Sequence, residues 1–158
     1  MSDAAELRLE SSSPAETRSI GQRLGRALRP GDVIVLEGDL GAGKTTFTQG
    51  IAVGMGIDEA ITSPTFVLAR EMPAGTTGVT LTHVDAYRLS SLEEWDDLDI
   101  DLANTAVVIE WGARVQRALP GDRIAVRFEG DDAARTLYVT CHGPDPSCLL
   151  LALGGDGG

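Results

Sequence analysis

The residues with the clearest chemical meaning lie in one short stretch, GDLGAGKTTF, which runs from Gly38 to Phe47. It matches the phosphate-loop pattern G-x-x-x-x-G-K-[ST], with Lys44 and Thr45 in its last two positions. Glycines let successive backbone N–H groups curl around an anion, and the amino end of the following helix adds a positive dipole. The stretch therefore predicts a phosphate site in which the Lys44 ammonium contacts phosphates and the Thr45 hydroxyl is a ligand of Mg²⁺.

Lys44 is also unusual in the composition of the chain. Thirteen residues are lysine or arginine, and Lys44 is the only lysine among them. A guanidinium is a broad planar fork, whereas a ring of backbone amides admits only a slim point charge. The single exception marks a position where the chemistry requires lysine. It also argues against guanine specificity, because an N-K-x-D segment would need a second lysine.

Two acidic residues end strand-like segments and are candidates for the metal side of the site. Glu110 ends the apolar run AVVIE, and Asp85 ends LTHVD, whose middle is polar. A phosphate loop needs such a carboxylate from a neighbouring strand to hold Mg²⁺ or its water shell. The purer apolar run favours Glu110, as a direct or water-mediated ligand or as the group that orients the attacking water. Asp85 remains the alternative.

Two further polar residues lie near these candidates. Thr65, in TSPTF after the phosphate-loop helix, stands where a nucleotide-sensing loop is expected, and its hydroxyl would follow the γ-phosphate. A proline-containing turn into a strand is the alternative. His83 lies two residues before Asp85, and we expect it to be a hydrogen-bonded core residue rather than a metal ligand.

The elements expected around these residues alternate between strands and helices. Strands are predicted over 7–9, 33–36, 63–70, 79–85 and 106–110, and alternating patterns over 123–129 and 136–142 predict a hairpin. Capping boxes at Ser13 and Ser91 predict two helix starts, the phosphate loop leads into a helix that ends near Gly56, and a short helix is expected over 114–119. We expect an α/β fold of the three-layer P-loop NTPase type, with a mostly parallel central sheet, antiparallel edge strands and a C-terminal β-hairpin.

The segment LEEWDDLDID, residues 92–101, holds six acids in ten residues. We expect a short helix with a solvated acidic face, and Leu92, Trp95 and Leu98 would form its buried side. A docking surface for a basic partner is the alternative interpretation of the same charges.

Length and charge restrict the possible functions. The 158 residues predict one domain over 1–142 and a loosely ordered tail over 143–158. A net charge of -11 disfavours direct binding of DNA or RNA. The start of the sequence lacks signal-peptide character, and no apolar run approaches the roughly 20 residues of a membrane span, so we expect a cytoplasmic protein without membrane contact.

Taken together, the motifs resemble the bacterial TsaE ATPases, also called YjeE. The resemblance rests on GDLGAGKTTF, on SPTF from Ser63, on HVDAYRL from His83 and on IEW from Ile109, in the family's order. It covers roughly residues 13–141, with departures at Asp99, where the family often has glycine, and in the tail. It implies a small ATPase that serves the formation of N6-threonylcarbamoyladenosine at position 37 of tRNAs. Such a protein acts on the TsaD–TsaB complex, does not transfer the group itself, and meets tRNA only through that complex.

The resemblance also implies roles for single residues. Thr45 and Glu110 would hold Mg²⁺, with Asp85 as a further candidate ligand, and Asp85 and Thr65 would line the γ-phosphate side as catalytic residues. The residues that would contact ATP are, in chain order, Thr17, Asp39, Leu40, Gly41, Ala42, Gly43, Lys44, Thr45, Thr46, Trp111 and Arg135. The first and the last of these would lie near the base.

Two other functions fit parts of the sequence. The segment DAYR resembles the acid–arginine step of small nucleoside or nucleotide kinases, but no stretch clusters the arginines that a kinase lid requires. An ATP-sensing interaction module with negligible hydrolysis would need the same phosphate cradle as a slow ATPase.

Overall fold

The computed structural model describes residues 5–38, 43–57, 69–86, 89, 91–111, 119, 123–130 and 134–142. The segment 63–68, the predicted helix over 114–119 except Leu119, and the tail over 143–158 lie outside the described residues. In the described part of the chain, no helix has both the length and the apolar character of a membrane span. The elements are β1 (Ala5–Ser11), α1 (Pro14–Ala27), β2 (Val33–Glu37), α2 (Lys44–Gly54), β3 (Ala69–Met72), β4 (Leu81–Asp85), α3 (Leu92–Asp97), β5 (Ala106–Glu110), β6 (Arg123–Gly130) and β7 (Arg135–His142).

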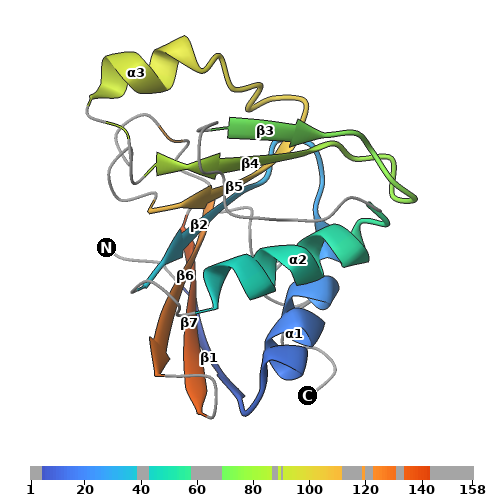
Figure 1. Ribbon diagram of the computed structural model, residues 1–158, viewed down its shortest axis with the longest axis vertical. Coiled ribbons are helices and arrows are strands. Elements are labelled where there is room, and N and C mark those ends of the chain that lie inside the picture. The colour runs from blue at the N-terminus through green and yellow to red at the C-terminus, as the bar shows by residue number, and fades with distance from the viewer. Residues whose placement is uncertain are drawn as a thin grey trace.

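The strands form one seven-stranded sheet in the order β1-β7-β6-β2-β5-β4-β3 (Figure 1). The central strands β6, β2, β5 and β4 run parallel to one another. The pairs β1–β7, β6–β7 and β3–β4 are antiparallel. The predicted α/β fold, with its parallel centre, antiparallel edges and C-terminal hairpin, is confirmed.

Both faces of the central strands are buried, which explains their continuous apolar runs. In β2, Ile34 and Leu36 belong to one hydrophobic cluster with residues of α1 and α2. Val33 and Val35 point the other way and join a second cluster with Trp95 of α3. The sheet is thus the middle of three layers, with α1 and α2 on one face and α3 on the other.

The short helix α3 confirms part of the prediction for the acidic segment. Trp95 is 5% exposed and packs in the second cluster, and Leu98 is partly buried against it. Leu92 is 40% exposed, so its predicted place on the buried side was wrong. Leu92 and Trp95 are three residues apart, so their side chains point about 60° apart around a helix of 3.6 residues per turn. When Trp95 points into the core, Leu92 therefore points away from it. Asp99, just after α3, has a φ of 53°, in the left-handed region that favours glycine.

Two serines begin helices as predicted. The hydroxyl of Ser13 accepts a hydrogen bond of 3.2 Å from the N–H of Glu16, and Ser91 accepts one of 3.2 Å from the N–H of Glu94. The carboxylate of Glu16 accepts a hydrogen bond of 2.7 Å from the N–H of Ser12, one residue earlier in the chain than in a standard capping box.

Helices α1 and α2 lie side by side, and their backbones touch at glycines (Figure 1). Gly21 and Gly25 of α1 face α2, and Gly50 and Gly54 of α2 face α1. A Cβ at Gly25 would lie 3.0 Å from a carbonyl carbon of α2, and a Cβ at Gly50 would lie 2.9 Å from a carbonyl carbon of α1. These distances are shorter than ordinary contacts, so any larger residue would force the helices apart.

We predict that Gly25→Ala and Gly50→Ala each destabilise the protein, by about 1–3 kcal/mol, because an extra methyl overpacks the helix contact. Helix propensity alone would favour alanine by about 1 kcal/mol, so the sign of the change separates the two effects. Urea unfolding measures it. Ser19→Ala, at an exposed position of α1, is the control and should stay within about 0.5 kcal/mol. Stabilisation by either glycine substitution would contradict the close contact.

Candidate nucleotide site

The candidate site lies where the parallel strands end. In register, Leu36 of β2 pairs with Glu110 of β5, and Glu110 pairs with Asp85 of β4. The chain leaves β2 immediately afterwards and enters the phosphate loop. Both predicted acids therefore lie at the C-terminal ends of the parallel strands, beside the point where the phosphate loop begins. Open α/β sheets bind their ligands at this end.

The described part of the phosphate loop has the backbone that an anion site requires. Gly43, at the N-cap of α2, has a φ of 98° in the left-handed region, where glycine is favoured. Glycine has no side chain with which to cap the helix, so the first-turn N–H groups of α2 face the loop. Thr45 and Thr46 are partly exposed in this turn. The loop residues Asp39, Leu40, Gly41 and Ala42 lie outside the described residues.

The side chain of Lys44 is almost completely buried, with 5% of the residue exposed. Its Nζ donates a 2.6 Å hydrogen bond to the carbonyl oxygen of Gly38 and lies 4.4 Å from the centroid of the Trp111 ring. Trp111 has a φ of 63°, and its N–H donates to the carbonyl oxygen of Leu36 at 2.9 Å. The ammonium is thus held between the end of β2 and an aromatic face, an arrangement that favours a cation.

Glu110 is 6% exposed, and its carboxylate has a buried partner. Its Oε2 lies 2.7 Å from Nε2 of His83, which is 1% exposed on the neighbouring strand β4. His83 is therefore the hydrogen-bonded core residue that its position predicts. Sequence reasoning did not identify Glu110 as the partner of His83. Asp85, at the end of β4, is partly exposed.

The oxygen ligands at this end of the sheet fit a Mg²⁺ ion that arrives with a nucleotide. A hydroxyl, Thr45, and two carboxylates, Asp85 and Glu110, are oxygen ligands of the kind that Mg²⁺ prefers. Among the described residues, no three His, Cys, Asp or Glu side chains gather closely enough to hold a metal ion by themselves. Mg²⁺ is commonly held by one or two carboxylates together with substrate phosphates, so the arrangement suits a shared ion.

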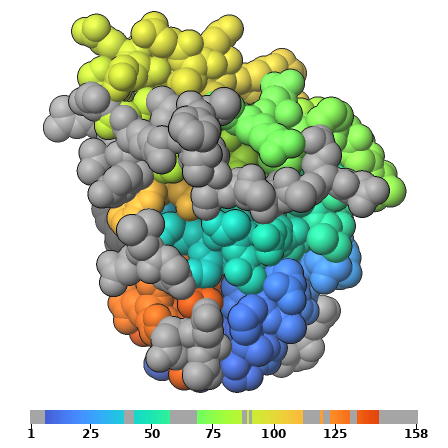
Figure 2. All heavy atoms as spheres, in the orientation of Figure 1, coloured from blue at the N-terminus to red at the C-terminus, as the bar shows by residue number. Residues whose placement is uncertain are grey.

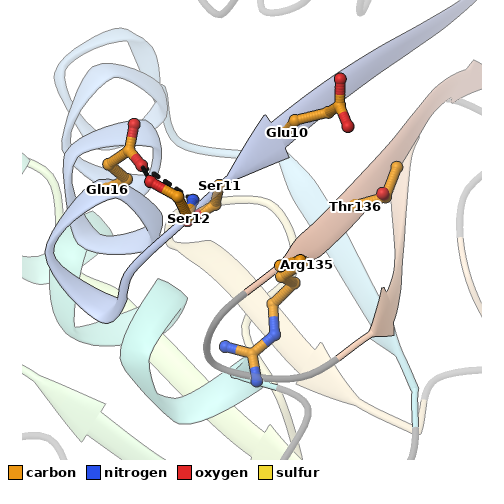
Figure 3. A pocket seen from close by; sticks show the side chains of 7 residues that line it. Glu10, Ser11, Ser12, Glu16, Arg135 and Thr136 are labelled. Atoms are coloured by element: carbon orange, nitrogen blue, oxygen red, sulfur yellow. Dashed lines mark hydrogen bonds between the residues drawn. The ribbon is translucent and has the colours of Figure 1, made fainter.

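A pocket of about 310 Å³ lies beside Arg135 (Figure 3). Arg135, at the start of β7, is 3% exposed, and Figure 3 shows its guanidinium directed toward the first turn of α2. A Cβ at Gly43 would lie 2.8 Å from the Arg135 Cζ, so the guanidinium packs on the loop backbone. The pocket is lined by Glu10, Ser11, Ser12, Glu16, Ala134, Arg135 and Thr136.

Thr17, the other residue expected near the base, lies beneath this pocket. It is fully buried, and its hydroxyl oxygen is 2.8 Å from that of Ser11. It therefore supports the pocket through Ser11. At the rim, hydrogen bonds from the Ser12 hydroxyl and N–H lower the pKa of the Glu16 carboxyl below its ordinary value.

The structure brings together the predicted residues Lys44, Trp111, Glu110 and Asp85 at one end of the sheet, and it places Arg135 against Gly43. In Figure 2, atoms of α2 (teal) border those of β5 (gold) on one side and those of α1 (blue) on the other. Thr65 lies outside the described residues, so its predicted role remains a prediction.

Comparison with known proteins agrees with the fold. Residues 11–137 match the model of a family described as threonylcarbamoyl adenosine biosynthesis protein TsaE. A relative from Streptomyces coelicolor, named tRNA threonylcarbamoyladenosine biosynthesis protein TsaE, is 47% identical over 80% of this chain and 89% of its own. A protein of the same name from Bacillus subtilis is 39% identical, over 80% and 81% of the two chains. The crystal structure of B. subtilis YdiB superposes with a TM-score of 0.78 at 32% identity, covering 98% of both chains.

We predict that Lys44→Ala lowers the affinity for Mg-ATP by at least about 10-fold, because hydrogen bonds to charged groups contribute roughly 1.5–3 kcal/mol. Calorimetric titration measures the affinity, and thermal unfolding checks that the fold is retained. Lys44→Arg is the matched variant: it keeps the charge, yet it should also bind poorly because a planar guanidinium does not fit the loop. Near-normal affinity of the alanine variant would rule out the phosphate-loop assignment.

Proposed function

Since the chain belongs to the TsaE family of tRNA threonylcarbamoyladenosine biosynthesis proteins, we propose that it binds ATP with Mg²⁺ and hydrolyses ATP slowly. The observation that carries this proposal is the buried Lys44, whose Nζ lies at the start of α2 between Gly38 and Trp111. A cation held out of water at the amino end of a helix is suited to phosphate groups.

Each group at this end of the sheet then has a defined role in binding or hydrolysis. Lys44 and the first-turn N–H groups of α2 bind the phosphates. Thr45 and Glu110, with Asp85 as the alternative acid, would hold the metal ion, which would neutralise phosphate charge. Glu110 or Asp85 also orients the attacking water. Glu110 is buried, which restricts the movement of its carboxylate, whereas Asp85 is partly exposed to solvent.

The base and sugar would lie toward the pocket beside Arg135. Its guanidinium packs against Gly43 of the phosphate loop and also lines the pocket, so Arg135 connects the two. Its volume, about 310 Å³, is at the lower end of the range for small-molecule sites. The chain has no second lysine for an N-K-x-D segment, which favours adenine over guanine.

The role of hydrolysis follows from the family and from the charge of the chain. A protein with a net charge of -11 is repelled by isolated tRNA, so we place its action on the TsaD–TsaB protein complex. The threonylcarbamoyl transfer itself belongs to that complex. The loop that contains Thr65 would respond to the γ-phosphate and change the affinity for the complex.

We predict that Glu110→Ala lowers the hydrolysis rate by about 100-fold, far more than it lowers the affinity for Mg-ATP, because a carboxylate on the metal side acts mainly on charge that develops in the transition state. Phosphate release and calorimetric titration measure the two quantities. Asp85→Ala is the internal comparison. Loss of hydrolysis in the Asp85 variant alone would reverse the assignment of the two acids.

Hydrolysis should also depend on the partner. We predict slow phosphate release by the purified protein, an increase when TsaD and TsaB are added, and little response to tRNA by itself. Coupling of this kind typically amounts to 1–3 kcal/mol, and by reciprocity the complex must change ATP affinity by the same factor. The four conditions are the protein alone, with the protein pair, with tRNA and with both.

Two variants complete this experiment. Lys44→Ala gives the background rate, and Thr65→Ala should lose the stimulation by TsaD and TsaB. Stimulation by tRNA alone would contradict action through the protein complex. A rate of phosphate release that does not change when TsaD and TsaB are added would favour an ATP-sensing module or a kinase.

A further inference from the structure

The contact between His83 and Glu110 joins two central strands inside the protein. The Nε2 and Oε2 atoms are 2.7 Å apart, and the side chains are 2% and 8% exposed. Glu110 ends the apolar strand β5, and His83 lies in the middle of β4, the adjacent strand, which runs parallel to β5. A polar pair in such a position is costly unless each group satisfies the other.

The chemistry of the two groups sets the direction of this hydrogen bond. A carboxylate that holds a metal ion is ionised and only accepts hydrogen bonds, so in that role of Glu110 the donor is Nε2 of His83. A bond to an ionised acceptor is stronger than one between neutral groups. It occupies one oxygen of Glu110 and restricts rotation of the carboxylate, while Oε1 is left for other partners.

Glu110 immediately precedes Trp111, whose ring faces the Lys44 ammonium, and it pairs in register with Asp85. We propose that His83 is a positioning residue: by holding Oε2, it keeps the Glu110 carboxylate in the orientation that serves the metal side of the nucleotide site. This inference rests on the proposed function. Partners that orient a metal-binding carboxylate typically change metal affinity or activity by 10- to 100-fold when they are removed.

The adjacent residue of β4 offers a matched comparison. Thr82 is 3% exposed, and its hydroxyl oxygen lies 2.9 Å from that of Thr105. Successive side chains of a strand point to opposite faces, so Thr82 and His83 are buried on opposite sides of the same sheet. Removing the Thr82 hydroxyl therefore breaks a buried hydrogen bond of β4 without touching Glu110.

The test compares His83→Leu, His83→Gln and Thr82→Val. The first readout is the factor by which Mg²⁺ strengthens ATP binding, from calorimetric titrations with Mg²⁺ and with EDTA. His83→Leu should reduce this factor and lower TsaD–TsaB-stimulated hydrolysis by 10- to 100-fold, while ATP affinity in EDTA stays within about twofold. His83→Gln should recover part of the loss because its amide N–H₂ is a donor. Thr82→Val should lower the unfolding temperature and leave the Mg²⁺ factor unchanged.

A second comparison separates positioning from a general effect on the fold. In a Glu110→Ala background, His83→Leu should leave the Mg²⁺ factor unchanged, because its effect passes through Glu110. The inference would be overturned if His83→Leu reduced the Mg²⁺ factor in the Glu110→Ala background as much as it does in the unsubstituted protein. It would also be overturned if a folded His83→Leu protein had an unchanged Mg²⁺ factor. If the unsubstituted protein shows no effect of Mg²⁺ on ATP binding, the proposed function fails instead. If His83→Leu does not fold, His83→Gln and His83→Asn make the same comparison. The shorter asparagine should lose more of the Mg²⁺ factor than glutamine does.

Discussion

The burial of one ammonium group, that of Lys44, is the constraint on which the site depends. Removing a cation from water is costly, and the cost must be offset by nearby acceptors and polarizable groups. The carbonyl oxygen of Gly38 and the ring of Trp111 provide this compensation. Both are set by the sheet, because Gly38 follows β2 directly and Trp111 donates its N–H to Leu36 of the same strand. The position of the charge is therefore a property of the β2–β5 pairing.

The helix that begins with Lys44 is held by backbone contacts along its length. Its middle lies against α1 at glycines such as Gly25 and Gly50, so the distance between the helices has little freedom. Its far end is held by the connection between β3 and β4, where the N–H of Thr77 donates to the carbonyl oxygen of Met55 at 3.3 Å. Contacts between backbones leave no rotamers to adjust, which suits a helix that must present a charge at a fixed place.

Several features of this protein follow from the sequence because each depends on neighbouring residues. The phosphate loop, the helix starts at Ser13 and Ser91 and the hairpin of β6 and β7 all have local signatures of glycine, cap or alternation. The continuous apolar run of β2 likewise predicts a strand covered on both faces. Backbone hydrogen bonding and side-chain periodicity act over a few residues, so such patterns identify elements and the chemistry at their ends.

Only the tertiary structure decided which of these residues meet. The contact of His83 with Glu110 depends on the register of two paired strands and joins residues 27 positions apart in the sequence. Arg135 reaches Gly43 of the phosphate loop because β7 runs antiparallel to β6 and therefore begins at the end of the sheet where β2 finishes. Leu92 fits a helical stripe in the sequence, but the rotation of a six-residue helix on the sheet leaves it exposed. Register and helix rotation are set by the packing of the whole core, and no short stretch of sequence contains that information.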